Sequence, residues 1–207
     1  MEQRSPEWFA FRLGKITASA LTNVMKRTKY GESKYKTRYR TELAIERLTG
    51  KRANIVIPNQ AMKDGTEREP DARILFEKIA GKKVDECGAY VHPDIKNASA
   101  SPDGMVVGEK AILELKCPTM VTHSHNLLSS TMPKDYVYQV QWQIECTKSD
   151  YGYFASYHPD YPDGLKLKWM RVERDEEIIN DLVKTIGEFD NEIEELVTEL
   201  KESNIQF

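Results

Sequence analysis

The chain has 207 residues and a mass of 23.9 kDa, which suits one α/β or α+β domain, residues 1–207, with a sizeable core. No apolar run reaches the roughly 18 residues of a membrane span, and the first residues lack the layout of a signal peptide. We therefore expect a cytoplasmic protein without a membrane partner. Cys87, Cys117 and Cys146 are far apart and form no C-x₂-C pair, which argues against a disulfide framework, a zinc site or an iron–sulfur cluster.

The net charge of −3 is unevenly distributed along the chain. Residues 173–202 carry twelve acidic and three basic side chains, so residues 1–172 have a net charge of +6. Within that part, residues 26–52 hold ten basic and three acidic side chains. This asymmetry predicts a basic face that meets phosphates and an acidic element held away from those phosphates. A solvated helix that merely happens to be basic is the alternative.

The first helix is expected to begin at Pro6 after the N-cap Ser5 and to end at Gly14. A second helix is expected from Ala20 to about Lys26. The loop before it ends in Thr-Ala-Ser, residues 17–19, and offers hydroxyls and free amides to an anion. Taken alone, these residues are more simply explained as helix caps.

Two further helices are expected in the first half of the chain. One covers 34–49, ends at Gly50, and interleaves tyrosines with basic side chains that can grip a DNA backbone. The next covers 60–80 and is interrupted by Gly65, after which Thr66-x-x-Glu69 reads as a capping box that restarts it. On spacing alone, Glu69 would only cap Thr66.

The second half of the chain alternates expected strands and helices. Strands are predicted over 83–92, 151–157 and 165–172, with a helix from Pro133 to about Thr147. His123 and His125 are expected in an exposed polar loop. Residues 175–202 form an amphipathic helix with an acidic outer face, which packs either on its own chain or against another subunit.

The most informative stretch is 101–118, SPDGMVVGEKAILELKCP. Two short apolar runs joined by Gly108-Glu109 predict a hairpin with a type II′ turn. In that register Asp103 lies opposite Glu114. Because strand side chains alternate between faces, Lys116 shares the face of Glu114.

Two carboxylates on one face form a hard, oxygen-rich site for Mg²⁺ or Mn²⁺. An adjacent ammonium group can orient a water molecule or offset charge that grows on a phosphate. This equipment can hydrolyse a phosphodiester. A surface hairpin with a merely solvated glutamate and lysine is the alternative for so short a pattern.

The same residues carry a family resemblance. Pro102-Asp103, followed by Glu114-x-Lys116, is similar to the PD-(D/E)xK nuclease core, and the flanking ASPDG and LELKCP resemble the phage lambda exonuclease (YqaJ-type viral recombinase) family. Further motifs of that family are matched in the same order by RLGKITAS at 12–19, by a helical motif from Gly65 to Glu77, and by YVYQVQ at 136–141. Pro70 departs from the helical motif. A proline at this position removes a backbone hydrogen-bond donor from the helix.

The resemblance implies a restriction-endonuclease-like core with a mixed central β-sheet flanked by helices. It implies a Mg²⁺-dependent exonuclease, with Mn²⁺ able to substitute, that digests one strand of linear duplex DNA from a 5′-phosphorylated end and leaves a 3′ overhang for recombination. A homotrimer threaded by DNA, a single-strand annealing protein as partner, and a phage or prophage protein acting in the bacterial host cytoplasm are also implied.

The resemblance assigns roles to individual residues. Asp103, Glu114 and the Leu115 carbonyl would bind the metal, and Lys116 would position or activate the attacking water. Glu69 and Gln139 would complete the site. Arg12 and Ser19 would hold the 5′-phosphate, with Lys26, Arg27 and Lys29 as further DNA contacts.

Two alternatives stay open. The chain could be another PD-(D/E)xK nuclease, either an endonuclease or a RecB-like enzyme. It could also be a catalytically silent DNA-binding or scaffold protein, although the complete set of Asp103, Glu114 and Lys116 speaks against that.

Overall fold

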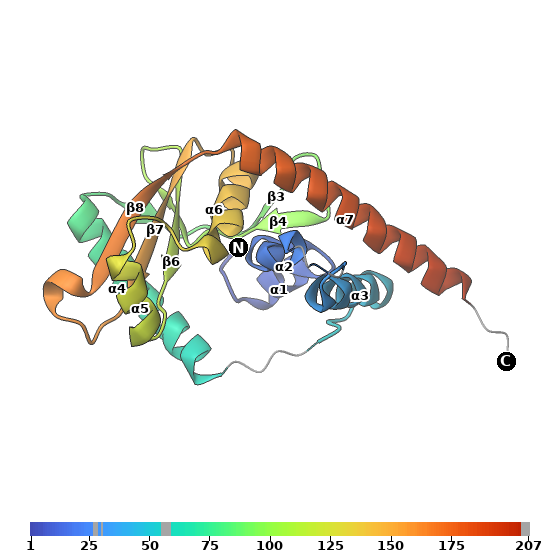
Figure 1. The fold of residues 1–207 in the computed structure, drawn as a ribbon, viewed down its shortest axis with the longest axis horizontal. Helices are drawn as coiled ribbons and strands as arrows, with labels where there is room; N and C mark the ends of the chain where they lie inside the picture. Colours follow the sequence, from blue (N-terminus) through green and yellow to red (C-terminus); the bar gives the residue numbers. More distant parts are fainter. Residues whose placement is uncertain (27–28, 30, 55–58, 204–207) are drawn as a thin grey trace.

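The computed structural model describes residues 1–26, 29, 31–54 and 59–203 (Figure 1). The α-helices are α1 (Pro6–Arg12), α2 (Leu21–Met25), α3 (Lys34–Thr49), α4 (Gln60–Ala80), α5 (Met120–Leu128), α6 (Lys134–Thr147) and α7 (Glu176–Glu202). The strands are β1 (Ile16–Thr17), β2 (Val84–Asp85), β3 (Tyr90–Val91), β4 (Ala98–Ala100), β5 (Gly104–Val106), β6 (Ala111–Lys116), β7 (Tyr151–Tyr157) and β8 (Leu167–Glu173). Short 3₁₀ helices cover Ala18–Ala20 and Asp163–Leu165. Over the described ranges, no helix has both the length and the apolar character needed to cross a bilayer.

The central sheet is mixed, as expected. Its strand order is β2-β5-β6-β7-β8, with β6 and β7 parallel and the other neighbours antiparallel. A small second sheet has the order β1-β4-β3. The single strand predicted over 83–92 is wrong, because β2 and β3 belong to different sheets. Between them the chain passes Gly88, where the backbone of Met1 packs so closely that an added Cβ would lie 2.9 Å from its carbonyl oxygen.

The two faces of the central sheet are covered by different helices (Figure 1). Ile112 and Phe154 pack against Val140 and Ile144 of α6. On the opposite face, Leu113, Tyr153 and other side chains pack against Ala72 and Phe76 of α4. Because side chains alternate along β6, the side chains two and four residues after Ile112 point toward α6. These two side chains are Glu114 and Lys116 of the expected nuclease motif.

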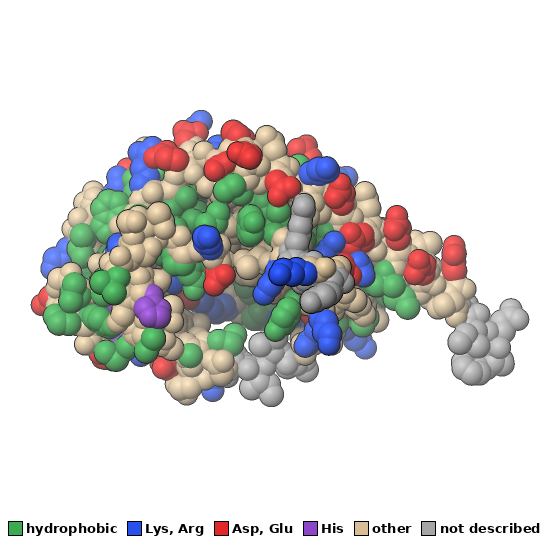
Figure 2. Space-filling view, viewed as in Figure 1, with side chains coloured by type: hydrophobic (Ala, Val, Ile, Leu, Met, Phe, Trp, Pro, Cys, Tyr) green, Lys and Arg blue, Asp and Glu red, His purple; other side chains and the backbone are tan. Residues whose placement is uncertain are grey.

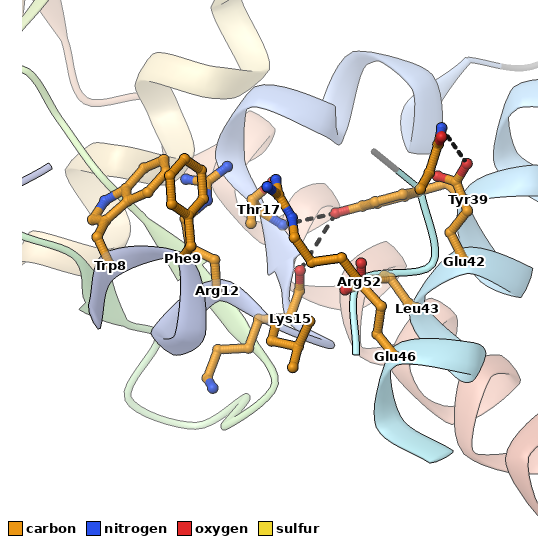
Figure 3. A pocket seen from close by; sticks show the side chains of 12 residues that line it. Trp8, Phe9, Arg12, Lys15, Thr17, Tyr39, Glu42, Leu43, Glu46 and Arg52 are labelled. Carbon is orange, nitrogen blue, oxygen red and sulfur yellow. Dashed lines mark hydrogen bonds between the residues drawn. The ribbon is translucent and has the colours of Figure 1, made fainter. Parts of the chain in front are cut away.

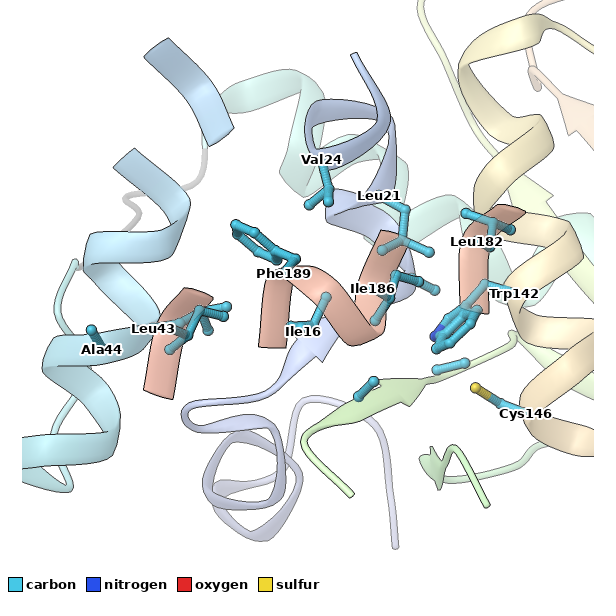
Figure 4. Packing of buried hydrophobic residues seen from close by; sticks show 14 of the residues in the cluster. Ile16, Leu21, Val24, Leu43, Ala44, Trp142, Cys146, Leu182, Ile186 and Phe189 are labelled. Atoms are coloured by element: carbon cyan, nitrogen blue, oxygen red, sulfur yellow. The ribbon is translucent and has the colours of Figure 1, made fainter. Parts of the chain in front are cut away.

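The last helix packs on its own chain. Leu182, Ile186 and Phe189 of α7 are fully buried against Leu21 and Leu43 from α2 and α3 (Figure 4). This arrangement explains the long amphipathic pattern at the end of the sequence, since one side of α7 completes the core beside the small sheet.

The acidic helix α7 packs against the basic helix α3 through ion pairs. Glu192 of α7 pairs with Lys36 and Arg40 of α3 at 2.9 and 2.7 Å, and Asp190 pairs with Arg47 at 2.7 Å. Figure 2 shows acidic side chains along α7 beside basic ones over the N-terminal helices. These basic side chains of α3 are therefore engaged inside the chain.

Helix α4 is continuous, so the predicted interruption at Gly65 and the Thr66–Glu69 capping box are wrong. Asn59 caps the true start of the helix by accepting a hydrogen bond from the Met62 amide at 2.9 Å. The Thr66 hydroxyl instead donates to the Met62 carbonyl at 3.1 Å. Pro70 consequently lies in the helix interior, where it removes the donor to the Thr66 carbonyl.

The expectation for the two histidines is half wrong. His125 is exposed, but His123 is fully buried in α5. Its Nδ1 lies 2.8 Å from the Ser156 hydroxyl and its Nε2 lies 2.9 Å from the Leu165 carbonyl. Burial lowers the pKa of His123, so a neutral ring joins α5 to β7. Sequence spacing did not indicate these partners, which lie far along the chain.

Substitutions in α7 test whether the helix stabilises the chain that carries it. We expect Leu182→Ala to lower the free energy of unfolding by about 2–5 kcal/mol, because Leu182 is fully buried. The matched variant Leu200→Ala removes a side chain that is 43% exposed on the same helix and should change stability by less than about 0.5 kcal/mol. Urea unfolding followed by circular dichroism measures both. Equal effects would contradict the assigned packing.

Candidate active site

The hairpin over 101–118 has the predicted register. Gly104 pairs with Leu113 and Met105 pairs with Ile112, which continues the ladder toward Asp103 and Glu114. The turn type is wrong, however. The Glu109 amide donates to the Val106 carbonyl at 3.2 Å, so Gly108, with a φ of 77°, occupies the third turn position rather than the second.

Asp103 immediately precedes the first residue of β5 and lies beside the backbone of β6. Its Oδ2 accepts a hydrogen bond from the Leu115 amide at 2.7 Å, while Oδ1 accepts none from the described residues. Burial raises the pKa of Asp103 well above its ordinary value, and the negative charges of Glu114 and Glu69 raise it further. Asp103 therefore carries an acceptor oxygen in a site that already holds excess negative charge.

Glu114 is the most constrained acid of the site. Its side chain is only 2% exposed, and both carboxylate oxygens accept hydrogen bonds, Oε1 from two donors and Oε2 from one. Oε1 accepts from Lys116 at 2.5 Å and from Gln139 at 2.6 Å, and Oε2 accepts from Gln143 at 2.6 Å. Three donors from β6 and α6 fix the carboxylate in one orientation.

Lys116 is held as an ammonium group. Burial lowers its pKa, but the attraction of Glu114 and Asp103 outweighs burial and raises the pKa above its ordinary value. The Nζ atom lies 3.3 Å from the Gln139 side-chain oxygen and 4.9 Å from the centroid of the Tyr136 ring. In this state Lys116 is a donor of hydrogen bonds and positive charge, with no free electron pair to act as a base.

Gln143 is a residue of the candidate site to which the sequence assigned no role. It follows Gln139 by four residues, so the two amides lie on one face of α6. That spacing is the signal that could have found it. Gln143 is fully buried, and its Oε1 has no hydrogen-bond partner in the described part of the chain.

Glu69 reaches the same region from α4. Its two carboxylate oxygens accept from one guanidinium nitrogen of Arg4 at 2.7 and 2.8 Å. Glu69, Arg4 and Asp103 all line a cavity of about 170 Å³. The fold thus brings Glu69 beside Asp103, as the family motif implies, but in contact with an N-terminal arginine that no motif predicted.

Two cysteine thiols near these carboxylates have raised pKa values. Burial and the negative charge of Asp103 raise the pKa of Cys87 to about 12. Burial, followed by Glu69 and Asp103, raises the pKa of Cys117 to about 12 as well. Both thiols are half-buried and free, and Cys146 is buried and free. All three are therefore protonated at neutral pH.

Arg12 lines a separate pocket of about 310 Å³ (Figure 3). Its guanidinium lies 4.2 Å from the centroid of the Trp8 ring, and Arg52 and Thr17 line the same pocket. Burial lowers the pKa of Arg12, and the charge of Arg52 lowers it further. Three cationic side chains, with Lys15 as the third, outnumber the two carboxylates that also line the pocket, so it can hold an anion.

The other residues assigned to DNA binding are less clearly placed. Ser19 is exposed on the 3₁₀ helix Ala18–Ala20 and is not among the residues lining the Arg12 pocket. Lys26 and Lys29 are exposed. Arg27 lies outside the described residues.

The donor set fits a divalent ion bound through few protein ligands. Among the residues that the structure describes, no group of three or more His, Cys, Asp and Glu side chains is placed to hold a metal ion. Mg²⁺ does not require one, because it commonly binds one or two carboxylates and completes its shell with water and substrate phosphate. Asp103, with an open Oδ1, and the fixed Glu114 meet that requirement.

Comparison with known proteins identifies related sequences. Residues 7–150 match the model of the YqaJ-like viral recombinase domain. The uncharacterized protein YqaJ of Bacillus subtilis (strain 168) is 32% identical over 197 residues. That match covers 92% of this chain and 57% of the relative, so the chain spans little more than half of the relative's length.

Solved structures of exonucleases are similar to this chain over most of its length. An alkaline exonuclease (LHK-Exo) from Laribacter hongkongensis is 35% identical with a TM-score of 0.88, over 96% of this chain and 97% of that one. Its complex with dAMP is 36% identical with a TM-score of 0.89 over the same shares. A phage related exonuclease from Haemophilus somnus 129PT, 16% identical over 90% of this chain and 96% of that one with a TM-score of 0.72, shares the fold. The chain therefore belongs to the YqaJ-like viral recombinase domain family.

Proposed function

We propose that the chain is a Mg²⁺-dependent exonuclease that digests one strand of linear duplex DNA in the 5′-to-3′ direction from a 5′-phosphorylated end. The product is a duplex with a 3′ single-stranded overhang suited to recombination. The observation that carries the proposal is the buried Glu114 carboxylate, fixed by Lys116, Gln139 and Gln143 beside the open oxygen of Asp103.

Asp103, Glu114 and the Leu115 carbonyl would hold the Mg²⁺ ion, with Glu69 and Gln139 around them. Mn²⁺ would substitute, since it prefers the same oxygen donors. Bound there, the ion supplies the charge that polarises a phosphodiester. The support from the chain is the burial of Asp103 beside the negative charges of Glu114 and Glu69, which together raise the pKa of Asp103.

Lys116 acts in this proposal through its positive charge. As an ammonium group it donates a hydrogen bond to the attacking water and offsets charge that develops on the phosphate. Gln139 contacts both Glu114 and Lys116 and thereby keeps their mutual orientation. Gln143 fixes the other oxygen of Glu114 from one helical turn further on.

The preference for a 5′ end is assigned to Arg12 and Ser19, with Lys26, Arg27 and Lys29 as further DNA contacts. Its support is the pocket that places Arg12 with Arg52 beside Trp8 and Phe9. A relative of 36% identity has been solved in complex with dAMP, and we extend that nucleotide-binding property to this chain.

We also propose an oligomeric state, a protein partner and a cellular location for the chain. Three copies form a ring threaded by DNA, a single-strand annealing protein is the partner, and the protein acts in the cytoplasm of a bacterial host as a phage or prophage product. Family resemblance is the support for each of these points.

Lys116→Ala tests the chemistry and the choice of substrate together. We expect a loss of about 10²-fold or more in the rate on linear duplex, because a charge aimed at the reacting phosphate is removed, while binding to DNA ends persists. Lys83→Ala, which removes an exposed lysine, should digest at the wild-type rate. Cleavage of covalently closed circular duplex by the wild type would instead indicate an endonuclease.

Arg12→Ala tests the pocket. On 5′-phosphorylated linear duplex, we expect kcat/KM to fall by about 10- to 100-fold, the range for hydrogen bonds to a charged group. On the same duplex with a 5′-hydroxyl the loss should be much smaller. End-labelled substrates measure both rates and the strand polarity. An undiminished preference for the phosphate would remove Arg12 from that role.

Asp103→Asn tests the metal site without measuring activity. A carboxyl with a raised pKa stabilises the fold while protonated and loses that contribution as pH rises through the raised pKa. At pH 8 in a chelator, the variant should therefore melt at a higher temperature than the wild type, with about 2–4 °C per kcal/mol.

The difference should shrink as pH falls toward about 4, where the wild-type carboxyl is protonated. Added Mg²⁺ should raise the melting temperature of the wild type and leave Asp103→Asn almost unchanged. Equal stabilisation of both proteins by Mg²⁺ would contradict the assignment of Asp103 as a ligand.

A further inference from the structure

The first five residues, Met1–Ser5, form a segment that we call the strap, and its residues 2–4 line the cavity that contains Asp103 and Glu69. The Gln3 side-chain amide donates to the Pro102 carbonyl at 2.6 Å, directly before Asp103 in the chain. The Met1 backbone packs against Gly88, where only a residue without a Cβ fits. The strap is therefore anchored on both the β5 entry loop and the segment between β2 and β3.

Arg4 of the strap reaches the acid that α4 contributes to the site. Both oxygens of Glu69 accept from Arg4 Nη2, at 2.7 and 2.8 Å. Arg4 has a φ of 65°, in the left-handed region that residues other than glycine rarely adopt. A conformation of this kind persists only where surrounding contacts hold it, and the Glu69 pair is one of those contacts.

The Arg4–Glu69 ion pair lies where another cation can replace Arg4. The Arg4 side chain is 44% exposed and that of Glu69 is 20% exposed, and exposed pairs of this kind are weak. Both residues line the cavity that also contains Asp103. A divalent ion that enters the cavity therefore meets a glutamate whose charge is already balanced by a single, displaceable cation.

We propose that Arg4 and the divalent ion compete for Glu69, so that the strap sets the metal affinity of the active site. The inference rests on the proposed metal-dependent function and adds a regulatory element to it. In the metal-free protein Arg4 balances the charge of Glu69, and metal binding releases Arg4 from the pair. The strap thus weakens metal binding by stabilising the metal-free state.

Mn²⁺ binding to the full chain in the absence of DNA tests the competition. We expect Arg4→Ala to lower the dissociation constant for Mn²⁺ by about two- to fivefold, the size expected when an exposed ion pair is removed as a competitor. Electron paramagnetic resonance of free Mn²⁺ gives the constant directly. Arg4→Gln is the second variant, since it removes the charge and keeps a side chain of similar length.

The matched control is Arg171→Ala. Arg171 also pairs with a glutamate, Glu173, at 2.6 Å and is 49% exposed, but it lies on β8. Its removal should leave the dissociation constant unchanged. Unchanged or weaker Mn²⁺ binding by both Arg4 variants would overturn the competition.

A double variant separates competition from a general effect of charge. In the Glu69→Gln background, Arg4→Ala should have no effect on Mn²⁺ binding, because the shared group is gone. Equal tightening in both backgrounds would show a general field effect and overturn the inference. Absence of Mn²⁺ binding by the wild type would overturn the proposed metal-dependent function itself, whereas binding without a response to Arg4 would overturn only the role of the strap.

Discussion

The burial of one carboxylate organises this site. A charged group taken out of water is costly unless hydrogen bonds and an opposite charge surround it, and Glu114 has both. Lys116 supplies the charge, and two amides of α6 supply the remaining donors. Removal of one partner from a buried pair typically costs about 3–5 kcal/mol, so the packing of α6 against β6 is tied to the same residues as the chemistry.

The face of the sheet that packs against α6 has an apolar part and a polar part. The apolar side chains of Ile112 and Phe154 seat α6 on the sheet, and the next side chains on that face of β6 are polar. The same surface is therefore core at one end and active site at the other. On the opposite face, α4 packs through Phe76 while its earlier turns carry Glu69 to the cavity. Helices α4 and α6 therefore both cover the sheet and carry residues of the candidate site.

Local sequence patterns predicted many of the helices and strands. Contacts between residues far apart in the sequence could not be predicted in this way. Alternation along β6 was enough to place Glu114 and Lys116 on one face, and the register with β5 followed from the hairpin. No local pattern indicates that α7 acids pair with Arg47 or that Arg4 meets Glu69, 65 residues away. Glycine and capping signals also misled in α4, because a continuous helix tolerates Gly65 when its ends are capped elsewhere.

The site combines a fixed side and an adjustable side. Glu114 is held by three donors and is almost inaccessible, whereas the Glu69 side chain is 20% exposed and pairs with the more exposed Arg4. A binding site for an ion that must enter and leave needs both properties. In the proposed metal site, the fixed acid would define where the ion is bound, since it cannot move without unpairing buried groups. In the proposed exchange, Glu69 would change partner at low cost, so that metal affinity would be altered there without disturbing the buried network around Glu114.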